Sequence, residues 1–182
     1  MPTQQPFMTN AQGTRRFACS AVAVQAIILK ADERLLLLSS PTRNRPGEWQ
    51  IISGGLEAAE TVLDGVLREL REEAGPQMQV RPLGVVHAQT LHFDAQVPYM
   101  IGIYHLLAYE GGRVQPGDDM RDAQYRWWSI DELTAANIRF HPSTHLWMLQ
   151  RAVAPYRCRK NQPAVPLQPD LDPEHRGLMR EA

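Results

Sequence analysis

Three glutamates near the end of one predicted helix have the clearest potential for chemistry. Glu69, Glu72 and Glu73 are related as i, i+3 and i+4, so on a helix they fall within an arc of about 100°. Like charges at this spacing repel by about 0.2–0.5 kcal/mol a pair, and the end of a helix favours cations instead. A hard divalent cation such as Mg²⁺ selects clustered carboxylate oxygens and would relieve both penalties. From the helix alone, a solvated acidic face partly neutralised by Arg68 is the favoured interpretation, and a metal site is the alternative.

The residues before this helix shift the balance toward a metal site. Gly54 and Gly55 end a predicted strand and begin a tight loop that carries Glu60. The segment from Gly54 to Pro76 resembles the Nudix box, G-x5-E-x7-R-E-U-x-E-E-x-G-U, in which U is aliphatic. The positions that match its spacing are Gly54, Glu60, Arg68, Glu69, Leu70, Glu72, Glu73 and Gly75. Only Pro76 departs from it, at the helix end, where we expect a local adjustment without loss of chemistry.

Two segments outside the box support the resemblance. They are the W-x-x-x-S-G-G-x-E sequence at 49–57 and the Y-R-W-W-S-I-D-E-L sequence at 125–133. The similarity extends over about 17–154. It implies a Nudix-like α/β/α sandwich with a mixed β-sheet and a catalytic loop–helix–loop.

The resemblance also implies the roles of individual residues. Hydrolases of this family hold Mg²⁺ or Mn²⁺ and direct a water at one phosphorus of a diphosphate. The metal ligands implied here are Glu69, Glu72, Glu73 and the backbone carbonyl of Ser53. The catalytic residues implied are Glu72, Glu69, Arg68 and Glu60, with Arg68 orienting Glu60 or Glu72 through a charge-assisted hydrogen bond.

Many relatives carry a further acid on a distal loop, as a base or an extra ligand. Arg121 stands near the matching position and cannot serve, whereas Asp119 and Asp122 (with Asp118) lie close by. A solvated acidic turn is an equal interpretation for each of these aspartates. A base within the glutamate cluster is the simpler alternative.

Substrate contacts are predicted outside the box. Arg43 and Arg45, in the loop before Trp49, are positioned to reach phosphates, although a solvated loop is the default interpretation. Trp127 is a candidate to stack on a base, with core packing as its alternative. The six histidines show no zinc-like spacing with cysteine.

The predicted activity is therefore Mg²⁺-dependent pyrophosphohydrolysis of a nucleotide-type substrate. Nucleoside triphosphates, dihydroneopterin triphosphate and nucleoside diphosphate derivatives all stay open. A non-catalytic nucleotide sensor on the same fold is the main alternative, and the intact glutamates and Arg68 argue against it. An isomerase on a related scaffold is a third, for which neither Cys19 nor Cys158 provides a visible match.

Composition limits the classes of partner. The chain of 182 residues has 43% hydrophobic and 21% charged residues and a net charge of -1, so nothing favours a nucleic acid polymer or an anionic membrane. Two cysteines are too few for a disulfide scaffold, which favours a cytoplasmic setting. The longest apolar run, 17–29, is shorter than the roughly 20 residues that span a bilayer. The expected partner is a small diphosphate compound, and a homodimer stays open.

The predicted elements place the box between strands. Strands are expected at 18–30, 34–39, 49–52, 81–93, 98–109 and 125–130, from their Val, Ile and aromatic content and the turn residues between them. Thr61 and Gly75 bound the helix at 62–74 as N-cap and C′ residue. A short helix begins at Asp131, and Ser143 is expected to cap a last helix that runs to about Val153.

The chain is thus predicted to form one domain with two extensions. The flexible segment 1–16 precedes the Nudix-like domain at 17–154, and a Pro-rich tail at 155–182 follows it.

Overall fold

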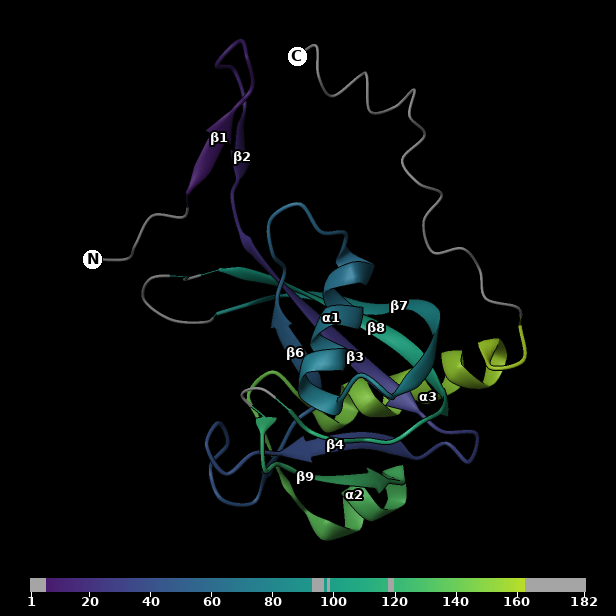
Figure 1. The fold of residues 1–182 in the computed structure, drawn as a ribbon. Coiled ribbons are helices and arrows are strands. Elements are labelled where there is room, and N and C mark those ends of the chain that lie inside the picture. Colours follow the sequence, from purple (N-terminus) through teal and green to yellow (C-terminus); the bar gives the residue numbers. More distant parts are fainter. Residues whose placement is uncertain (1–5, 93–96, 98, 118–119, 163–182) are drawn as a thin grey trace.

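A mixed β-sheet forms the centre of the fold (Figure 1). The computed structural model describes residues 6–92, 97, 99–117 and 120–162, and within these the main sheet has six strands. They are β3 (Ala21–Leu29), β4 (Leu35–Ser39), β6 (Ile52–Gly55), β7 (Gln79–Leu91), β8 (Met100–Gly111) and β9 (Gln124–Trp128). Central β3 runs parallel to β8 and antiparallel to β6 and β4. The prediction of a mixed sheet is confirmed.

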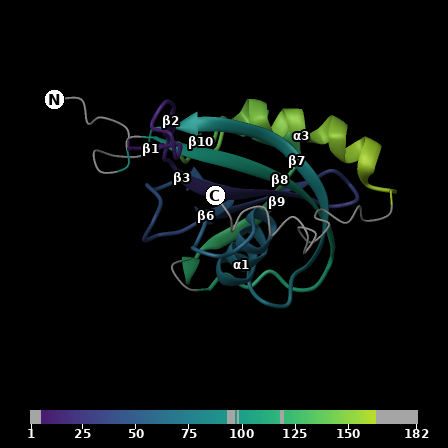
Figure 2. The ribbon, with the colours of Figure 1, turned by 90° about the horizontal axis from the view of Figure 1, so that it is seen from above.

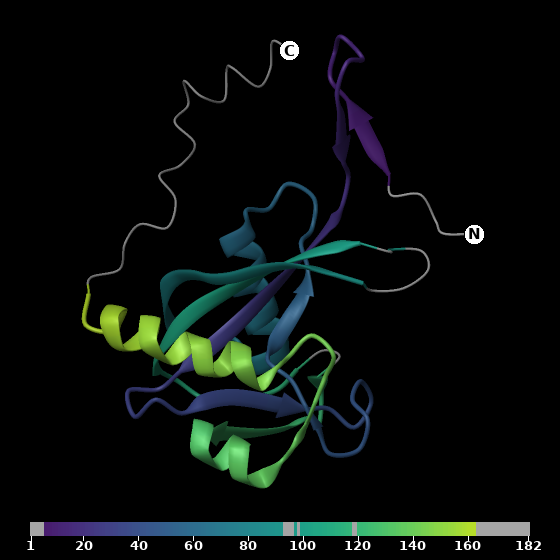
Figure 3. The ribbon, with the colours of Figure 1, turned by 180° about the vertical axis from the view of Figure 1, so that it is seen from behind.

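Helices cover both faces of this sheet, as Figure 2 shows. Alternation along β3 builds two apolar layers: Val24 and Ile28 pack with α1 (Val62–Ala74), and Ile27 and Leu29 pack with α3 (Leu146–Arg159). Seen from behind, α3 crosses the sheet (Figure 3). The short helix α2 (Ile130–Ala136) follows β9. The predicted α/β/α layering is therefore correct.

The box helix α1 begins and ends where the sequence predicts. Thr61 Oγ1 accepts a hydrogen bond of 3.2 Å from the Asp64 amide, which satisfies one of the free donors of the first turn. Gly75 adopts a positive φ of 99°, and its amide donates to the Arg71 carbonyl. A side chain at Gly75 would be strained, so glycine ends the helix here.

The last helix differs from its prediction at both ends. Its N-cap is His145 rather than Ser143, and it continues through Pro155 to Arg159. Tyr156 is only 2% exposed and packs in the α3 core layer, while Arg159 donates to a β7 carbonyl at 3.0 Å. These contacts offset the hydrogen bond lost at Pro155, so the predicted end of this helix near Val153 is wrong.

The start of the chain also differs from its prediction. In place of an irregular segment followed by one strand from Ala18, β1 (Phe7–Thr9) and β2 (Arg16–Ala18) pair as an antiparallel hairpin that projects from the sheet (Figure 1). A small parallel pair joins β5 (Glu48–Trp49) to β10 (Arg139–Phe140).

Some predictions fall outside the described residues. The predicted turn at 93–96 and the tail from 163 onward both do. Within the described part of the chain, none of the helices has the length and apolar character needed to cross a membrane.

Candidate active site

The acidic face of α1 is turned toward the sheet rather than toward solvent. Glu73 is 1% exposed and Glu69 is 9% exposed, whereas the Glu72 side chain keeps 39% of its surface. Burying carboxylates is costly unless they are paired. The partial burial of this face contradicts the interpretation of a merely solvated acidic surface.

Gly54 makes the burial of Glu69 possible. A Cβ atom built at Gly54 would overlap the Glu69 carboxylate, whereas one built at Gly55 meets nothing within 4 Å. The Glu69 side chain therefore occupies the space that a side chain on β6 would take. This explains physically why glycine stands at the first of the two positions.

Arg68 draws three carboxylates together. Its guanidinium donates to Glu60 at 2.8 Å, Glu69 at 2.7 Å and Glu72 at 2.9 Å, and also to the Gly55 carbonyl at 2.8 Å. The hydrogen bonds with Glu60, followed by those with Glu69 and Glu72, raise the pKa of Arg68 further above its ordinary value. The same contacts hold the pKa of Glu60 below its usual range. Arg68 and Glu60 are therefore both charged near neutral pH.

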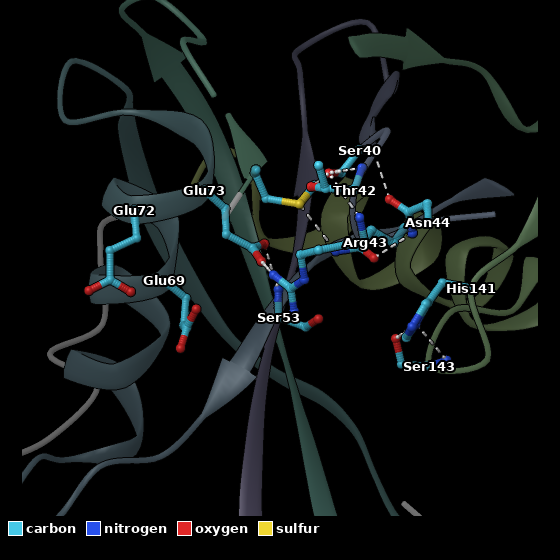
Figure 4. A network of polar contacts seen from close by, with 12 residues as sticks. Ser40, Thr42, Arg43, Asn44, Ser53, Glu69, Glu72, Glu73, His141 and Ser143 are labelled. Carbon is cyan, nitrogen blue, oxygen red and sulfur yellow. Dashed lines mark hydrogen bonds and ion pairs between the residues drawn. The ribbon is translucent and has the colours of Figure 1, made fainter. Parts of the chain in front are cut away.

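Glu73 joins α1 to β6 and to the loop after β4. One carboxylate oxygen accepts from the Ser53 amide at 3.0 Å, and the other accepts from Arg43 Nη1 at 2.6 Å. Figure 4 shows Arg43 reaching between Glu73 and the segment of His141. Glu73 thus holds the Arg43 guanidinium beside the other glutamates.

A hydrogen-bonded loop holds Arg43 in this place. Asn44 Oδ1 accepts from the Ser40 amide at 2.7 Å, and its Nδ2 donates to Gln50 Oε1 at 2.8 Å. All three of these side chains are buried. The loop is therefore ordered by buried hydrogen bonds, whereas the default expectation from sequence is a solvated loop.

The donor atoms at this face fit a hard divalent cation. Glu69 and Glu72 each direct one oxygen at the same atom, Arg68 Nη1, so their carboxylates converge. A divalent cation at this point would find two hard oxygen ligands from one helix turn. Within the described residues, no three His, Cys, Asp or Glu side chains are grouped as metal ligands, and Arg68 and Arg43 hold several of the carboxylate oxygens. A cation would have to displace part of this pairing.

A cavity of about 440 Å³ opens beside the glutamates. Arg43, Ser53 and Gly54 lie at its border with the cluster. The rest of its lining comes from β3, the ends of β6, β7 and β8, and the segment before α3. These residues are Ala23, Gln25, Gly55, Leu91, His92, Met100, His141, Pro142 and Ser143. Its volume is in the range of small-molecule sites.

His141 in this lining is held neutral. Its Nδ1 lies 2.8 Å from Ser143 Oγ. Burial lowers the pKa of His141, and the charge of Arg43 lowers it further, while Glu48 opposes both. Since the ordinary value is about 6.5, the imidazole is neutral at pH 7 and can either accept or donate a hydrogen bond.

Several residues predicted from sequence lie elsewhere. Arg45 and Asp122 line a separate groove of about 320 Å³ that shares no lining residue with this cavity. The Trp127 ring lies 5.0 Å from that of Tyr109 and 4.3 Å from Lys30 Nζ, and it packs in the α1 core layer. Asp118 and Asp119 lie outside the described residues.

Gln25 and His141 are residues of the cavity that the sequence did not single out. Gln25 is a polar residue within an apolar strand, and this is the one sequence feature that could have pointed to it. His141 is a lone histidine in a polar segment and gives no signal by spacing.

The comparisons with known proteins agree with this geometry. The NUDIX domain family model matches residues 20–151. The NAD-capped RNA hydrolase NudC of Vibrio parahaemolyticus is 30% identical over 124 residues, covering 65% of this chain and 41% of that protein. An ADP-ribose pyrophosphatase of Methanocaldococcus jannaschii is 32% identical over 111 residues, covering 61% of this chain and 64% of the relative.

Solved structures share the fold at lower identity. A NUDIX hydrolase from Nitrosomonas europaea superposes with a TM-score of 0.57 at 18% identity, covering 77% of this chain and 90% of that one. The chain spans about two fifths to two thirds of the length of the first curated relatives that it matches. Because the family model covers well over half of the sequence, the resemblance predicted from residues 54–76 is confirmed, and the chain belongs to the Nudix hydrolase family.

Proposed function

We propose that the chain hydrolyses a diphosphate linkage in a nucleotide-type substrate, with Mg²⁺ (or Mn²⁺) held by Glu69 and Glu72. The observation that carries this proposal is the convergence of Glu60, Glu69 and Glu72 on Arg68, with Gly54 leaving the space for Glu69. A structural helix face has no need of this arrangement.

The chemistry is the cleavage of one phosphoanhydride bond. Water attacks phosphorus, the bridging P–O bond breaks, and each product keeps one phosphate group. The bound cation would neutralise charge on the phosphate oxygens and polarise the attacking water. Glu72 is the most exposed of the three glutamates on α1. One of its oxygens would bind the cation, and the proposal gives the other the proton of that water. Glu73 and the Ser53 carbonyl would complete the cation site once Arg43 moves onto the substrate.

Arg43 is proposed as the phosphate contact. It lies between the glutamates and the cavity, and its side chain is 36% exposed. A substrate that extends from the glutamates into the cavity must pass the Arg43 guanidinium. The proposal therefore assigns phosphate binding to Arg43. Arg45 lines the separate groove and Trp127 packs in the α1 core layer, which supports this choice.

The favoured substrates are nucleoside diphosphate derivatives such as ADP-ribose and NAD. Curated relatives at about 30% identity include an ADP-ribose pyrophosphatase and hydrolases of NAD-capped RNA. Both names point to a diphosphate that joins adenosine to a second group. The cavity beside the cluster supplies room for one of the two halves.

A substrate panel tests the proposal. ADP-ribose, NAD, nucleoside triphosphates and dihydroneopterin triphosphate would each be incubated with the full chain and Mg²⁺, with and without EDTA, and products separated by chromatography. We expect hydrolysis of at least one diphosphate derivative to two phosphate-bearing products, and no hydrolysis with EDTA. Binding without any hydrolysis across the panel would contradict an enzyme and support a sensor.

A further inference from the structure

The cavity beside the glutamates has walls of two kinds. Leu91, Met100 and Pro142 supply apolar surface, whereas Gln25 and His141 bring polar groups. Apolar walls with a few fixed polar atoms are typical of small-molecule sites that hold a ligand in one orientation. The polar atoms therefore decide which ring is accepted.

A hydrogen-bond network fixes the orientation of Gln25. The hydroxyl of Tyr104 donates its proton to the Ser143 carbonyl at 3.1 Å and accepts from Gln89 Nε2 at 2.9 Å. The side chain of Gln25 bonds to the same hydroxyl. Because the hydroxyl proton is already used, Gln25 must present its NH₂ group as the donor. Its carboxamide cannot turn over without losing this bond.

The oxygen of Gln25 is consequently left without a partner. Gln25 is 1% exposed, and its Oε1 is one of three buried side-chain atoms that lack a hydrogen bond within the described residues. The other two belong to His105 and Trp128, neither of which lines the cavity. Buried acceptors are normally paired, so a lone one on a residue that lines a cavity indicates a missing donor.

The neighbouring strand leaves room for this arrangement. A Cβ atom built at Gly102 on β8 would lie 2.9 Å from Leu91 Cδ1 and 3.2 Å from Gln25 Nε2. Any larger residue there would push Gln25 or the apolar wall inward. The glycine thus preserves both the orientation of Gln25 and the shape of the cavity.

We propose that this cavity binds the base of the nucleotide substrate and that Gln25 Oε1 accepts a hydrogen bond from an exocyclic amino group of that base. The inference rests on the proposed function, because Arg43 and the glutamates then hold the diphosphate at the cavity border. A purine fits the apolar walls, and a single acceptor suits an amino group better than the several hydroxyls of a sugar. Gln25 is therefore a specificity-determining residue.

Binding of two non-hydrolysable probes tests this assignment. They are α,β-methylene-ADP and the same compound with its 6-amino group replaced by hydrogen, titrated by calorimetry into the full chain with Mg²⁺. We expect the wild type to prefer the amino compound by about 10-fold, the effect of one hydrogen bond to a buried acceptor. Gln25→Met should bring the two dissociation constants together.

Gln89→Met is the matched control. It removes the other amide that donates to Tyr104 but leaves Gln25 Oε1 in place, and Gln89 does not line the cavity. This variant should keep the 10-fold preference. The ratio of the two probes' dissociation constants in the wild type requires no variant. It therefore tests the inference even if Gln25→Met fails to fold.

Three results would overturn the inference: equal affinity of the wild type for both probes, no binding of either probe at millimolar concentration, or an undiminished preference in folded Gln25→Met. The substrate panel judges the proposed function separately. If the panel shows hydrolysis but the two probes bind equally well, the proposed function holds and the base site is refuted. If the amino compound binds more tightly but no substrate is hydrolysed, the base site holds and the proposed function is refuted.

Discussion

Gly54 and Arg68 explain why Glu69 and Glu72 stay close together on one helix. Gly54 gives Glu69 room against β6, and Arg68 holds Glu69 and Glu72 on a single nitrogen atom. Two like charges three residues apart would otherwise repel. The pairing keeps both carboxylates directed toward one point, as a cation site requires.

A methyl group at Gly54 should disable the site without unfolding the protein. Gly54→Ala would displace the Glu69 carboxylate, and an ångström-scale shift in such a site costs about 100-fold in turnover. Gly55→Ala is the matched control, since its added Cβ meets nothing within 4 Å. Equal turnover of the two variants, measured at saturating substrate and Mg²⁺, would refute the role given to Gly54.

The sequence predicted the residues of the box better than the residues around it. Fixed spacing on a helix decides which face Glu69 and Glu72 share, so the cluster could be inferred locally. Trp127 and Gln25 depend on which strand lies next to which and on which end of a strand meets the cavity. Pairing of strands distant in sequence decides both, and no local pattern carries that information.

Among the elements, the ends of α1 could be predicted from local capping residues, whereas the end of α3 could not. The ends of α1 follow from Thr61 and Gly75, whose side-chain and backbone properties act locally. The end of α3 could not be read from Pro155, because the burial of Tyr156 and the ion pair of Arg157 with Glu33 at 2.6 Å carry the helix past the proline. Local signals fail where tertiary contacts outweigh them.

The continuation of α3 should be needed for stability. Tyr156→Ala removes a large buried side chain from the α3 core layer and should lower the free energy of unfolding by about 3–5 kcal/mol. Cys158→Ala, at an exposed position of the same helix, should leave it nearly unchanged. Urea denaturation measures both, and a loss below about 1 kcal/mol for Tyr156→Ala would show that the domain does not depend on this turn.

For the whole molecule, the sheet brings together groups that lie far apart along the chain. Antiparallel pairing sets Gln25 of β3 opposite Ser53 of β6, and α1 packs on the same strands. The glutamates, Arg43 and the cavity are therefore parts of one surface built on the centre of the fold. Binding of a cation there should stabilise the folded state as a whole.

Mg²⁺ should accordingly raise the melting temperature. Only the folded chain brings Glu69 and Glu72 together, and a ligand at 100 times its dissociation constant stabilises by about 2.7 kcal/mol. Glu69→Gln combined with Glu72→Gln should abolish the increase, and NaCl of equal ionic strength serves as the salt control. An equal increase in the double variant would place the stabilising cation elsewhere.

The most direct measurement is the steady-state rate of Glu72→Gln with the best substrate of the panel at saturating Mg²⁺. The substitution keeps the size of the side chain and removes its charge. The account predicts that kcat falls by orders of magnitude while the melting temperature without Mg²⁺ stays near that of the wild type. Turnover close to the wild-type rate in this folded variant would contradict the assignment of the glutamate cluster as the catalytic centre.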